Sequence, residues 1–343
     1  MPTIRPFRAL RYDTAVAGPL DDLVAPPYDV ISADARREYL ARSSYNVVHL
    51  TLPDSPDDAA RDLAAWRADG VLREEEPAVW WVAQDYTGPD GVARTRAGFA
   101  ASIEATPYSA GQVLPHERTH AGPKEDRLRL LRATRTQLEP IFLLYDAGPP
   151  VGRPHGPPDL DVEEGAVRTR AWRVPLDHEL EIDTPLLIAD GHHRYETAVA
   201  FREEDPSATH LLAILVSSRA PGLEIFPTHR VVQALGDVPG EPVDAPGDGV
   251  TLYRDGRYLR VRTDDDFGPR VVESFAPEGV SYTAHADEAI ATVDRGEAAA
   301  AFLLQPVTVA QVARFAHAGE TMPQKSTFFY PKLTSGLLFH PVG

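Results

Sequence analysis

The sequence predicts an α+β protein with mixed sheets and flanking helices, and three observations lead to this fold class. Runs of apolar and β-branched residues typical of strands are interspersed with segments of helical periodicity. Turn sequences that favour β-hairpins, at 87–92 and at the Asp-Gly pair 255–256, separate some of these runs. The 343 residues are 43% hydrophobic and 25% charged, so the chain is long enough for two or three ordinary globular domains.

The first segment, residues 1–104, is expected to form an N-terminal α+β domain. Ser32 is a suitable helix N-cap, because its hydroxyl can accept a hydrogen bond from the first helical turn. The expected elements are a proline-fixed turn, a helix, a strand, an amphipathic helix and a β-hairpin, at residues 24–32, 32–42, 46–52, 55–72 and 78–105.

The second segment, residues 105–235, is expected to form a central core. Residues 148–165 are rich in proline, glycine and acidic residues, which predicts an exposed loop. The other expected elements are a loop, a helix and a strand within 114–146, a strand at 166–174, a short helix or loop at 177–183, and a strand, a helix and a strand at 185–189, 192–205 and 210–218.

The third segment, residues 236–343, is predicted to be a C-terminal α+β region. A β-hairpin is expected at 250–263, around the Asp-Gly turn. The chain shows no internal repeat that would indicate a solenoid or an array.

Composition excludes several classes of site and partner. The net charge of −17 repels phosphate backbones and acidic lipids, so nucleic acid is not expected as the main partner. The absence of cysteine excludes disulfides, thiol nucleophiles and cysteine-based zinc sites. No apolar run approaches the roughly 18–20 residues that span a bilayer, and residues 1–14 lack a signal sequence, so we expect a cytoplasmic protein without membrane contact. A local basic stretch at 118–135 suits a small anionic ligand.

A polar corner follows the most apolar strand of the second segment. The strand at 185–189 is followed by Asp190, Gly191, His192, His193 and Arg194, where the next helix begins. A helix N-terminus binds anions, Arg and His can clamp phosphate oxygens, and Asp can hold Mg²⁺. We therefore predict a phosphate-binding corner with Asp190 as metal ligand. The simpler alternative is that Asp190 is only an N-cap and the histidines are solvated.

The stretch His-Glu-Arg-Thr-His at 116–120 matches the pattern of zinc proteases, which works only on a helix. Pro115 precedes it and Ala-Gly-Pro follows it, which disfavours that helix. We interpret the stretch as a loop that presents Glu117 as a catalytic base, with His116 as a neighbour that tunes it. An ordinary charged surface loop is the alternative.

Further candidates are weaker, because each could be an ordinary exposed charge or part of a packed core. Only three of the 34 basic residues are lysines, and all three lie in motif-like stretches. Tyr28 and Asp29 are possible walls of the site. The additional candidates for binding a nucleotide are Lys124, Arg127, Thr228, His229, Arg230, Lys325 and Lys332.

These blocks, in order, resemble a known family. The stretches APPYDVIS, LPHERTHAGPKEDRL, IADGHHRYETA, PTHRVV and MPQKSTFFYPKLTSGL are similar to those of the bacterial family called domain of unknown function 1015. The similarity spans nearly the whole chain. The family carries the genome label of a ParB-like or partition-type protein.

A more distant likeness bears on mechanism. The succession of the loop at 114–120, a helix, an apolar strand and the corner at 190–194 resembles the ParB/sulfiredoxin-like fold, particularly its free-serine kinase branch. This resemblance implies a nucleotide-binding core at 105–235. It also implies that the corner binds nucleotide phosphates and that Glu117 serves as the base for a substrate hydroxyl.

The leading hypothesis is therefore a phosphotransferase that uses Mg²⁺ with ATP or ADP, or CTP, and acts on a small hydroxyl compound such as serine. Its oligomeric state stays open. A ParB-like nucleotide switch or slow NTPase with a protein partner is the first alternative. The others are a DNA-binding partition protein, which the charge opposes, and a metallohydrolase that uses His116, His120, His192 and His193.

Overall fold

The computed structural model describes residues 2–119, 121–276 and 278–342 of the chain, which divides into two compact units. Unit 1 comprises Met1–Pro115, Thr119–Leu223 and Pro331–Gly343, and unit 2 comprises His116–Arg118 and Glu224–Tyr330. Each unit contains helices and mixed or antiparallel sheets, so the predicted α+β class is confirmed.

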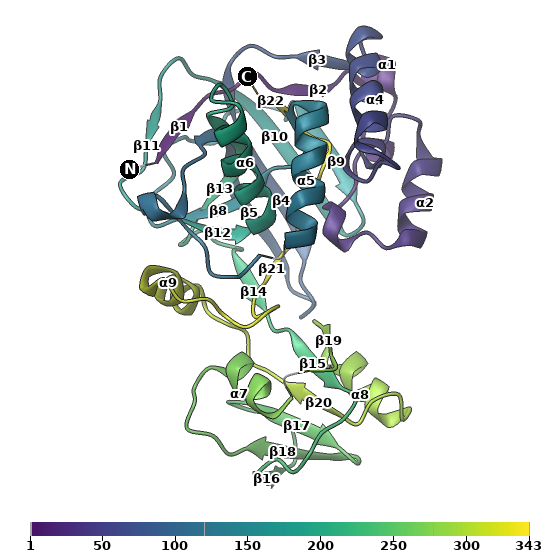
Figure 1. Cartoon of the computed structure of the whole chain (residues 1–343), viewed down its shortest axis with the longest axis vertical. Helices are drawn as coiled ribbons and strands as arrows, with labels where there is room; N and C mark the ends of the chain where they lie inside the picture. The colour runs from purple at the N-terminus through teal and green to yellow at the C-terminus, as the bar shows by residue number, and fades with distance from the viewer. Residues whose placement is uncertain (1, 120, 277, 343) are drawn as a thin grey trace. The chain divides into compact units, whose positions relative to one another are not determined.

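Unit 1 is built on a mixed sheet, which has ten strands within the described residues (Figure 1). β12 runs parallel to β6 and β13 parallel to β8, while the other neighbours are antiparallel. The main path, in spatial order, is β6 (Val113–Leu114), β12 (Leu186–Asp190), β8 (Ile141–Tyr145), β13 (His210–Ser217), β5 (Ala93–Glu104), β4 (Ala78–Thr87), β10 (Val167–Pro175) and β9 (Leu160–Glu164), and β1 (Thr3–Arg5) pairs with β5 and with β11 (Leu180–Glu181).

The sheet confirms some sequence expectations and corrects others. The predicted hairpin is formed by β4 and β5. Residues 177–183, expected as a short helix or loop, contain the short strand β11, because their backbone pairs with β1. The last residues of the expected loop at 148–165 form β9, which pairs with β10 at the edge of the sheet.

Helices cover the face of the sheet that carries its largest apolar core. α4, α5 and α6 lie side by side, and Figure 1 shows α5 and α6 in front of the strands. Tyr195 and Ala198 of α6 pack on Ile141, Leu143 and Ile188. The helices are α1 (Thr14–Ala17), α2 (Ala33–Arg42), α3 (Val48–Thr51), α4 (Pro56–Ala68), α5 (Ala121–Thr134) and α6 (His192–Glu204), with short 3₁₀ turns at Leu20–Asp22, Tyr28–Val30 and Tyr108–Ala110.

The prediction of a strand at 46–52 is wrong, because this stretch contains helix α3. Asn46 explains the difference. Its side-chain oxygen accepts a hydrogen bond from the Val48 amide at 3.0 Å, and its side-chain nitrogen donates to the carbonyls of Asp22 and Val24. These bonds fix the start of the short helix, and they outweigh the β-propensity of the valines.

The C-terminal segment, residues 331–343, completes unit 1 after the chain has formed unit 2. It pairs with distant backbone through the bridges Ser335 to Ala25 and Phe339 to Leu10. β22 (His340–Pro341) pairs with β7 (Thr136–Gln137). Because most of this segment is buried, it acts as a structural part of unit 1 and not as a free tail.

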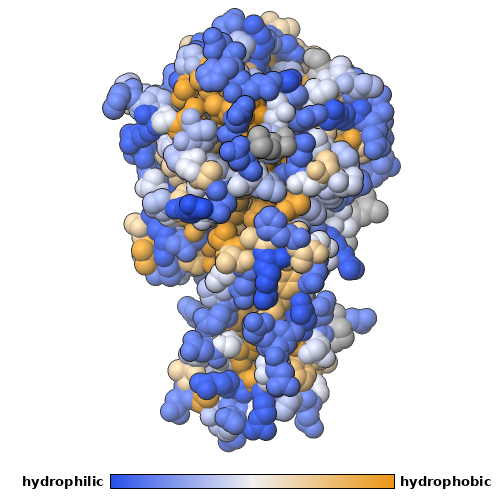
Figure 2. Space-filling model, turned by 90° about the vertical axis from the view of Figure 1, so that its left-hand side faces the viewer, coloured by the Kyte–Doolittle hydropathy of each residue, from blue (hydrophilic) through white to orange (hydrophobic). Residues whose placement is uncertain are grey.

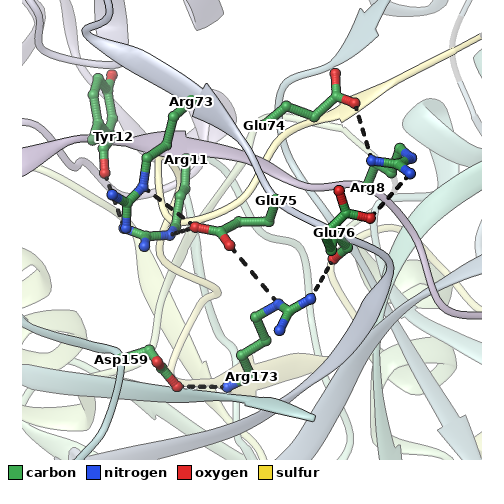
Figure 3. Close-up of polar contacts among 9 residues, drawn as sticks. All are labelled: Arg8, Arg11, Tyr12, Arg73, Glu74, Glu75, Glu76, Asp159 and Arg173. Atoms are coloured by element: carbon green, nitrogen blue, oxygen red, sulfur yellow. Dashed lines mark hydrogen bonds and ion pairs between the residues drawn. The ribbon is translucent and has the colours of Figure 1, made fainter. Parts of the chain in front are cut away.

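A network of charged residues joins the N-terminal part of unit 1 to the sheet (Figure 3). Glu75 forms ion pairs with Arg11 at 2.7 Å, Arg73 at 3.3 Å and Arg173 at 3.9 Å. Arg173 lies in β10, whereas the others lie in or beside the pair β2 (Leu10–Tyr12) and β3 (Leu72–Glu74). The network therefore fixes this small sheet against the large one, with Glu75 and Arg11 its most buried pair, at 19% and 13% exposed.

Unit 2 has an antiparallel sheet of six strands within its described residues, in the order β16, β18, β17, β20, β15 and β19. A second pair joins β14 to β21. The strands are β14 (Glu224–Phe226), β15 (His229–Val232), β16 (Gly240–Val243), β17 (Thr251–Arg254), β18 (Arg257–Val261), β19 (Val280–Thr283), β20 (Ala300–Leu303) and β21 (Phe328–Tyr330), and the helices are α7 (Gly268–Phe275), α8 (Ala286–Asp294) and α9 (Val309–Ala318).

The surface is mainly polar. In the space-filling view of Figure 2, hydrophilic side chains cover most of the visible face of each unit, as expected for a chain with net charge −17. Among the described residues, no helix combines the length and the apolar character needed to cross a bilayer.

The role of the C-terminal segment is testable at Phe339, which is fully buried and lies edge-on to Tyr12. Phe339→Ala should lower the free energy of unfolding of unit 1 by about 3–5 kcal/mol, because it leaves a cavity in a packed core. All four tryptophans lie in unit 1, so intrinsic fluorescence during denaturation reports this unit. Val92→Ala, at an exposed position, is the control and should change stability by at most about 0.5 kcal/mol. Equal effects of the two changes would contradict the assignment.

Candidate functional site

The predicted polar corner forms at the junction of β12 and α6. β12 ends at Asp190 and α6 begins at His192, so the strand–turn–helix expectation is confirmed. Gly191 between them has φ +94°, a left-handed conformation that favours glycine. A Cβ atom at this position would lie 2.9 Å from Ile141 Cγ2 and 3.2 Å from the Arg194 guanidinium. The glycine therefore lets Arg194 fold back over the turn.

Asp190 is the centre of an ion cluster. One carboxylate oxygen accepts a hydrogen bond from Lys332 Nζ at 2.5 Å, and the other accepts from Arg194 Nη2 at 2.8 Å. The side chains of Asp190, Arg194 and Lys332 are 15%, 11% and 22% exposed. Arg194 also donates to the Pro140 carbonyl. The corner thus joins residues from the strand, the helix and the C-terminal segment.

The charges in this cluster stabilise one another. Burial alone would raise the pKa of Asp190, but attraction to Lys332 and Arg194 outweighs it and holds this pKa well below its usual range. Burial likewise opposes the charge of Lys332, yet the neighbouring Asp190 leaves the pKa of Lys332 raised. All three groups are therefore ionised at neutral pH.

A second ring of polar groups surrounds the cluster. Glu139 is buried, and one of its carboxylate oxygens accepts from the Tyr28 amide at 3.0 Å and from Ser335 Oγ at 2.9 Å. Burial opposes the charge of Arg194, but Glu139, Asp190 and Asp29 together leave its pKa raised. Tyr28 and Asp29, expected as walls of the site, thus lie beside the corner.

Arg96 and Gln84 form a clamp that was not predicted from the sequence. Arg96 Nη2 donates to Gln84 Oε1 at 2.5 Å and to the Pro331 carbonyl at 2.7 Å, and Gln84 Nε2 donates to the Lys332 carbonyl at 3.2 Å. Burial lowers the pKa of Arg96 to about 10, so it is still charged at neutral pH. The pair fixes the main chain of residues 331–332 and thereby positions the Lys332 ammonium group. A lone arginine in the apolar strand at 95–105 is the sequence signal for it.

Other predicted ligands in unit 1 have partners in the protein. Lys124 Nζ lies 3.2 Å from Glu196, which also accepts a hydrogen bond from Thr119. Arg127 donates to the Thr51 carbonyl and stacks over the Tyr28 ring, 4.3 Å from its centroid. His192 is buried and close enough to Asp190 to favour its charged form. The binding roles of these residues, and of His193, stay predictions.

The loop with Glu117 belongs to unit 2. His116 is buried, and its Nε2 lies 3.0 Å from Thr327 Oγ1, which in turn donates to Glu117 Oε1 at 3.4 Å. Residues 116–119 are not helical, which agrees with the interpretation as a loop and opposes the zinc-protease pattern. His120 lies outside the described residues. Thr327 holds the Glu117 carboxylate, whose role as base stays a prediction.

Unit 2 also contains the candidates near residue 230. Arg230 Nη1 donates to the Thr228 carbonyl at 2.8 Å, and Nη2 lies 3.4 Å and 3.5 Å from the carbonyls of Gln324 and Lys325. His229 is buried, its Nδ1 accepts from the Leu304 amide, and burial lowers its pKa to about 4. The ring of His229 is therefore neutral and serves as a hydrogen-bond acceptor in the core.

A magnesium ion does not fit at Asp190 in this arrangement. Hard divalent cations need several oxygen ligands, whereas both Asp190 oxygens already contact cationic groups. In the part of the chain that the structure describes, no group of three or more His, Asp or Glu could hold a metal ion. The expectation of Asp190 as metal ligand is therefore replaced by that of an anion that holds two cations in place.

Comparison with known proteins places the chain in a family. The model of the family described as protein of unknown function (DUF1015) matches residues 4–244, so the chain belongs to this family. No curated protein matches it.

Several solved structures are similar to part of this chain. A conserved hypothetical protein from Pyrococcus furiosus is 14% identical with a TM-score of 0.39, and the match covers 68% of this chain and 93% of that one. A free serine kinase in complex with AMP is 15% identical with a TM-score of 0.42, covering 69% and 91%. SbnI with a C-terminal truncation, from Staphylococcus aureus, is 12% identical with a TM-score of 0.44, covering 69% and 85%. Identities this low do not transfer a function.

The ion cluster makes a direct prediction about stability. Asp190→Asn should lower the free energy of unfolding of unit 1 by about 3 kcal/mol, because Arg194 and Lys332 lose the anion that compensates them in a buried site. The matched control is Asp146→Asn, which breaks an exposed pair with Arg219 and should cost at most about 0.5–1 kcal/mol. Tryptophan fluorescence during denaturation measures both. A loss at Asp190 no larger than at Asp146 would show that the cluster contributes little.

Proposed function

We propose that this protein binds a nucleotide through its phosphates at the N-terminus of α6 and transfers a phosphoryl group to a small hydroxyl compound, with an amino acid such as serine as the leading candidate. The observation that carries the proposal is the convergence of Arg194 and Lys332 at a helix N-terminus that follows a left-handed glycine. Helix N-termini favour anions through their backbone amides and their dipole.

The chemistry of the two cations supports this use. Lys332 has three N–H donors and is partly exposed, so donors remain for a phosphate oxygen after it has contacted Asp190. Arg194 offers a planar group of donors that matches phosphate geometry. Asp190 holds both groups in place before a ligand arrives, and such preorganisation reduces the cost of binding.

The remaining step requires a base. In the proposed reaction the acceptor hydroxyl oxygen attacks the terminal phosphorus, the bond from that phosphorus to the bridging oxygen breaks, and the shortened nucleotide leaves, as ADP from ATP or as AMP from ADP. Glu117 takes the hydroxyl proton, a role suggested by the resemblance to the free-serine kinase branch. Its hydrogen bond from Thr327 fixes the carboxylate and supports this assignment.

The nucleotide site is tested by binding. A thermal-shift series with ATP, ADP, CTP and GTP should show stabilisation of about 2.7 kcal/mol when a true ligand is present at a hundred times its dissociation constant. Arg194→Ala should weaken that binding by about 2–4 kcal/mol. Arg202→Ala is the control on the same helix, where the arginine pairs with Glu104, and it should leave affinity unchanged. Unchanged affinity in Arg194→Ala, with the fold verified by circular dichroism, removes Arg194 from the site.

The base is tested by turnover. With ATP, Mg²⁺ in the buffer and serine, phosphorus NMR should show a new phosphate ester for the native protein. Glu117→Gln should bind nucleotide normally but form no ester, because the amide cannot take the proton. Glu320→Gln changes an exposed acid elsewhere in unit 2 and should retain full activity. Free phosphate without an ester would indicate a nucleotide hydrolase, and an unchanged rate in Glu117→Gln would exclude that residue as the base.

A further inference from the structure

Unit 2 contains a hollow of about 240 Å³. Arg230 in β15 and Tyr282 in β19, which are direct neighbours in the sheet, line it. Glu273 of α7, Glu278 and Gln324 are among the residues that form its sides. Pockets for drug-sized ligands measure roughly 300–1,000 Å³, so this one suits a smaller molecule.

Arg230 is a buried cation that lines the hollow. It is 4% exposed and keeps its charge, since burial lowers its pKa only to about 10. Its guanidinium carbon lies 5.6 Å from the centroid of the Tyr282 ring. Among the described residues, Arg230 donates hydrogen bonds to main-chain carbonyls, and no carboxylate forms an ion pair with it. A buried guanidinium without such an anion is costly, and a ligand carboxylate would compensate it.

The sides of the hollow carry the opposite charge. Glu273 and Glu278 are exposed, and neither forms an ion pair within the described residues. Glu273 is near enough to Arg230 to favour the charged guanidinium. A simple anion in the hollow would be repelled by these two carboxylates, and a simple cation would be repelled by Arg230. A molecule that carries both charges can place its anionic group near Arg230 and its cationic group near Glu273 and Glu278.

We propose that this hollow binds a small zwitterion of the α-amino-acid class, with the ligand carboxylate on Arg230 and its ammonium group facing Glu273 and Glu278. Arginine binds carboxylates with two parallel hydrogen bonds, which fixes their orientation. Tyr282 supplies an aromatic wall for the body of the ligand.

This inference rests on the proposed function and specifies where its acceptor binds. The segment 323–327 connects the hollow with the predicted base inside unit 2. The carbonyls of Gln324 and Lys325 contact Arg230, and Thr327 contacts His116 and Glu117. Unit 2 therefore carries both an amino-acid site and the carboxylate assigned to the hydroxyl proton.

The test is calorimetric titration of the full chain, without nucleotide, with L-serine, L-threonine, L-homoserine and L-alanine. Propionate and ethylamine serve as probes that carry only one of the two charges. At least one amino acid should bind to the protein. Each single-charge probe should bind to the protein at least tenfold more weakly than that amino acid, a difference equivalent to about 1.4 kcal/mol. If none of the amino acids binds, or if propionate binds as tightly as they do, the zwitterion site is excluded.

Variants locate the site. Glu273→Gln combined with Glu278→Gln should weaken amino-acid binding at least tenfold and leave propionate binding unchanged or stronger. Arg230→Lys keeps the charge but loses the paired donors, and it should also weaken amino-acid binding at least tenfold. Glu320→Gln should bind like the native protein. Equal amino-acid affinity in the native protein and the Glu273/Glu278 double variant would overturn the proposal.

The two proposals fail in different ways. Loss of amino-acid binding with intact nucleotide stabilisation would overturn the site in unit 2 alone and leave a nucleotide-binding protein with another acceptor. Amino-acid binding without any nucleotide stabilisation would support this site and overturn the phosphotransferase.

Discussion

The contact of Asp190 with Lys332 and Arg194 is the interaction on which the candidate site of unit 1 depends. A carboxylate removed from water is stable only when cations or hydrogen-bond donors replace its hydration, and at Asp190 two cations do so. The two cations depend on Asp190 in turn, because burying either positive charge here without the acid would be unfavourable. The clamp of Arg96 and Gln84 adds to it by fixing the main chain that carries Lys332. One ion cluster thus orients the start of α6 and holds the last segment of the chain.

The balance of charge in this cluster matters for ligand binding. Asp190 contacts both cations, so an arriving phosphate meets donors that are ordered before it binds. Unit 2 combines charges in another way, with a buried guanidinium and exposed carboxylates lining one hollow. The overall charge of −17 reveals neither of these local arrangements. Local placement of a few arginines, rather than net charge, therefore decides which small molecules each unit can accept.

Sequence reasoning succeeded where the determining contacts are local. The turn at Gly191 and the helix after Ser32 follow from residues within a few positions of each other. Lys332 was singled out, but its partner lies 142 residues away, and no spacing rule connects the two. Arg96 was missed because a charged residue in a strand usually indicates an exposed face, whereas here the C-terminal segment covers it. The divisions at residues 104 and 235 stay predictions, although β5 and β13, from the two sides of residue 104, pair in one sheet.

The order of the segments has a consequence for biosynthesis. Unit 1 receives residues 331–343 only after the whole of unit 2 has been made. Domains generally fold as units during translation, beginning at the N-terminus. During synthesis the sheet of unit 1 therefore stays incompletely covered until the residues from Pro331 onward have been made. Until that point Arg96 lacks its partner, the Pro331 carbonyl. Unit 2 can therefore reach its native state first, and unit 1 is completed only when the residues that follow unit 2 join its sheet.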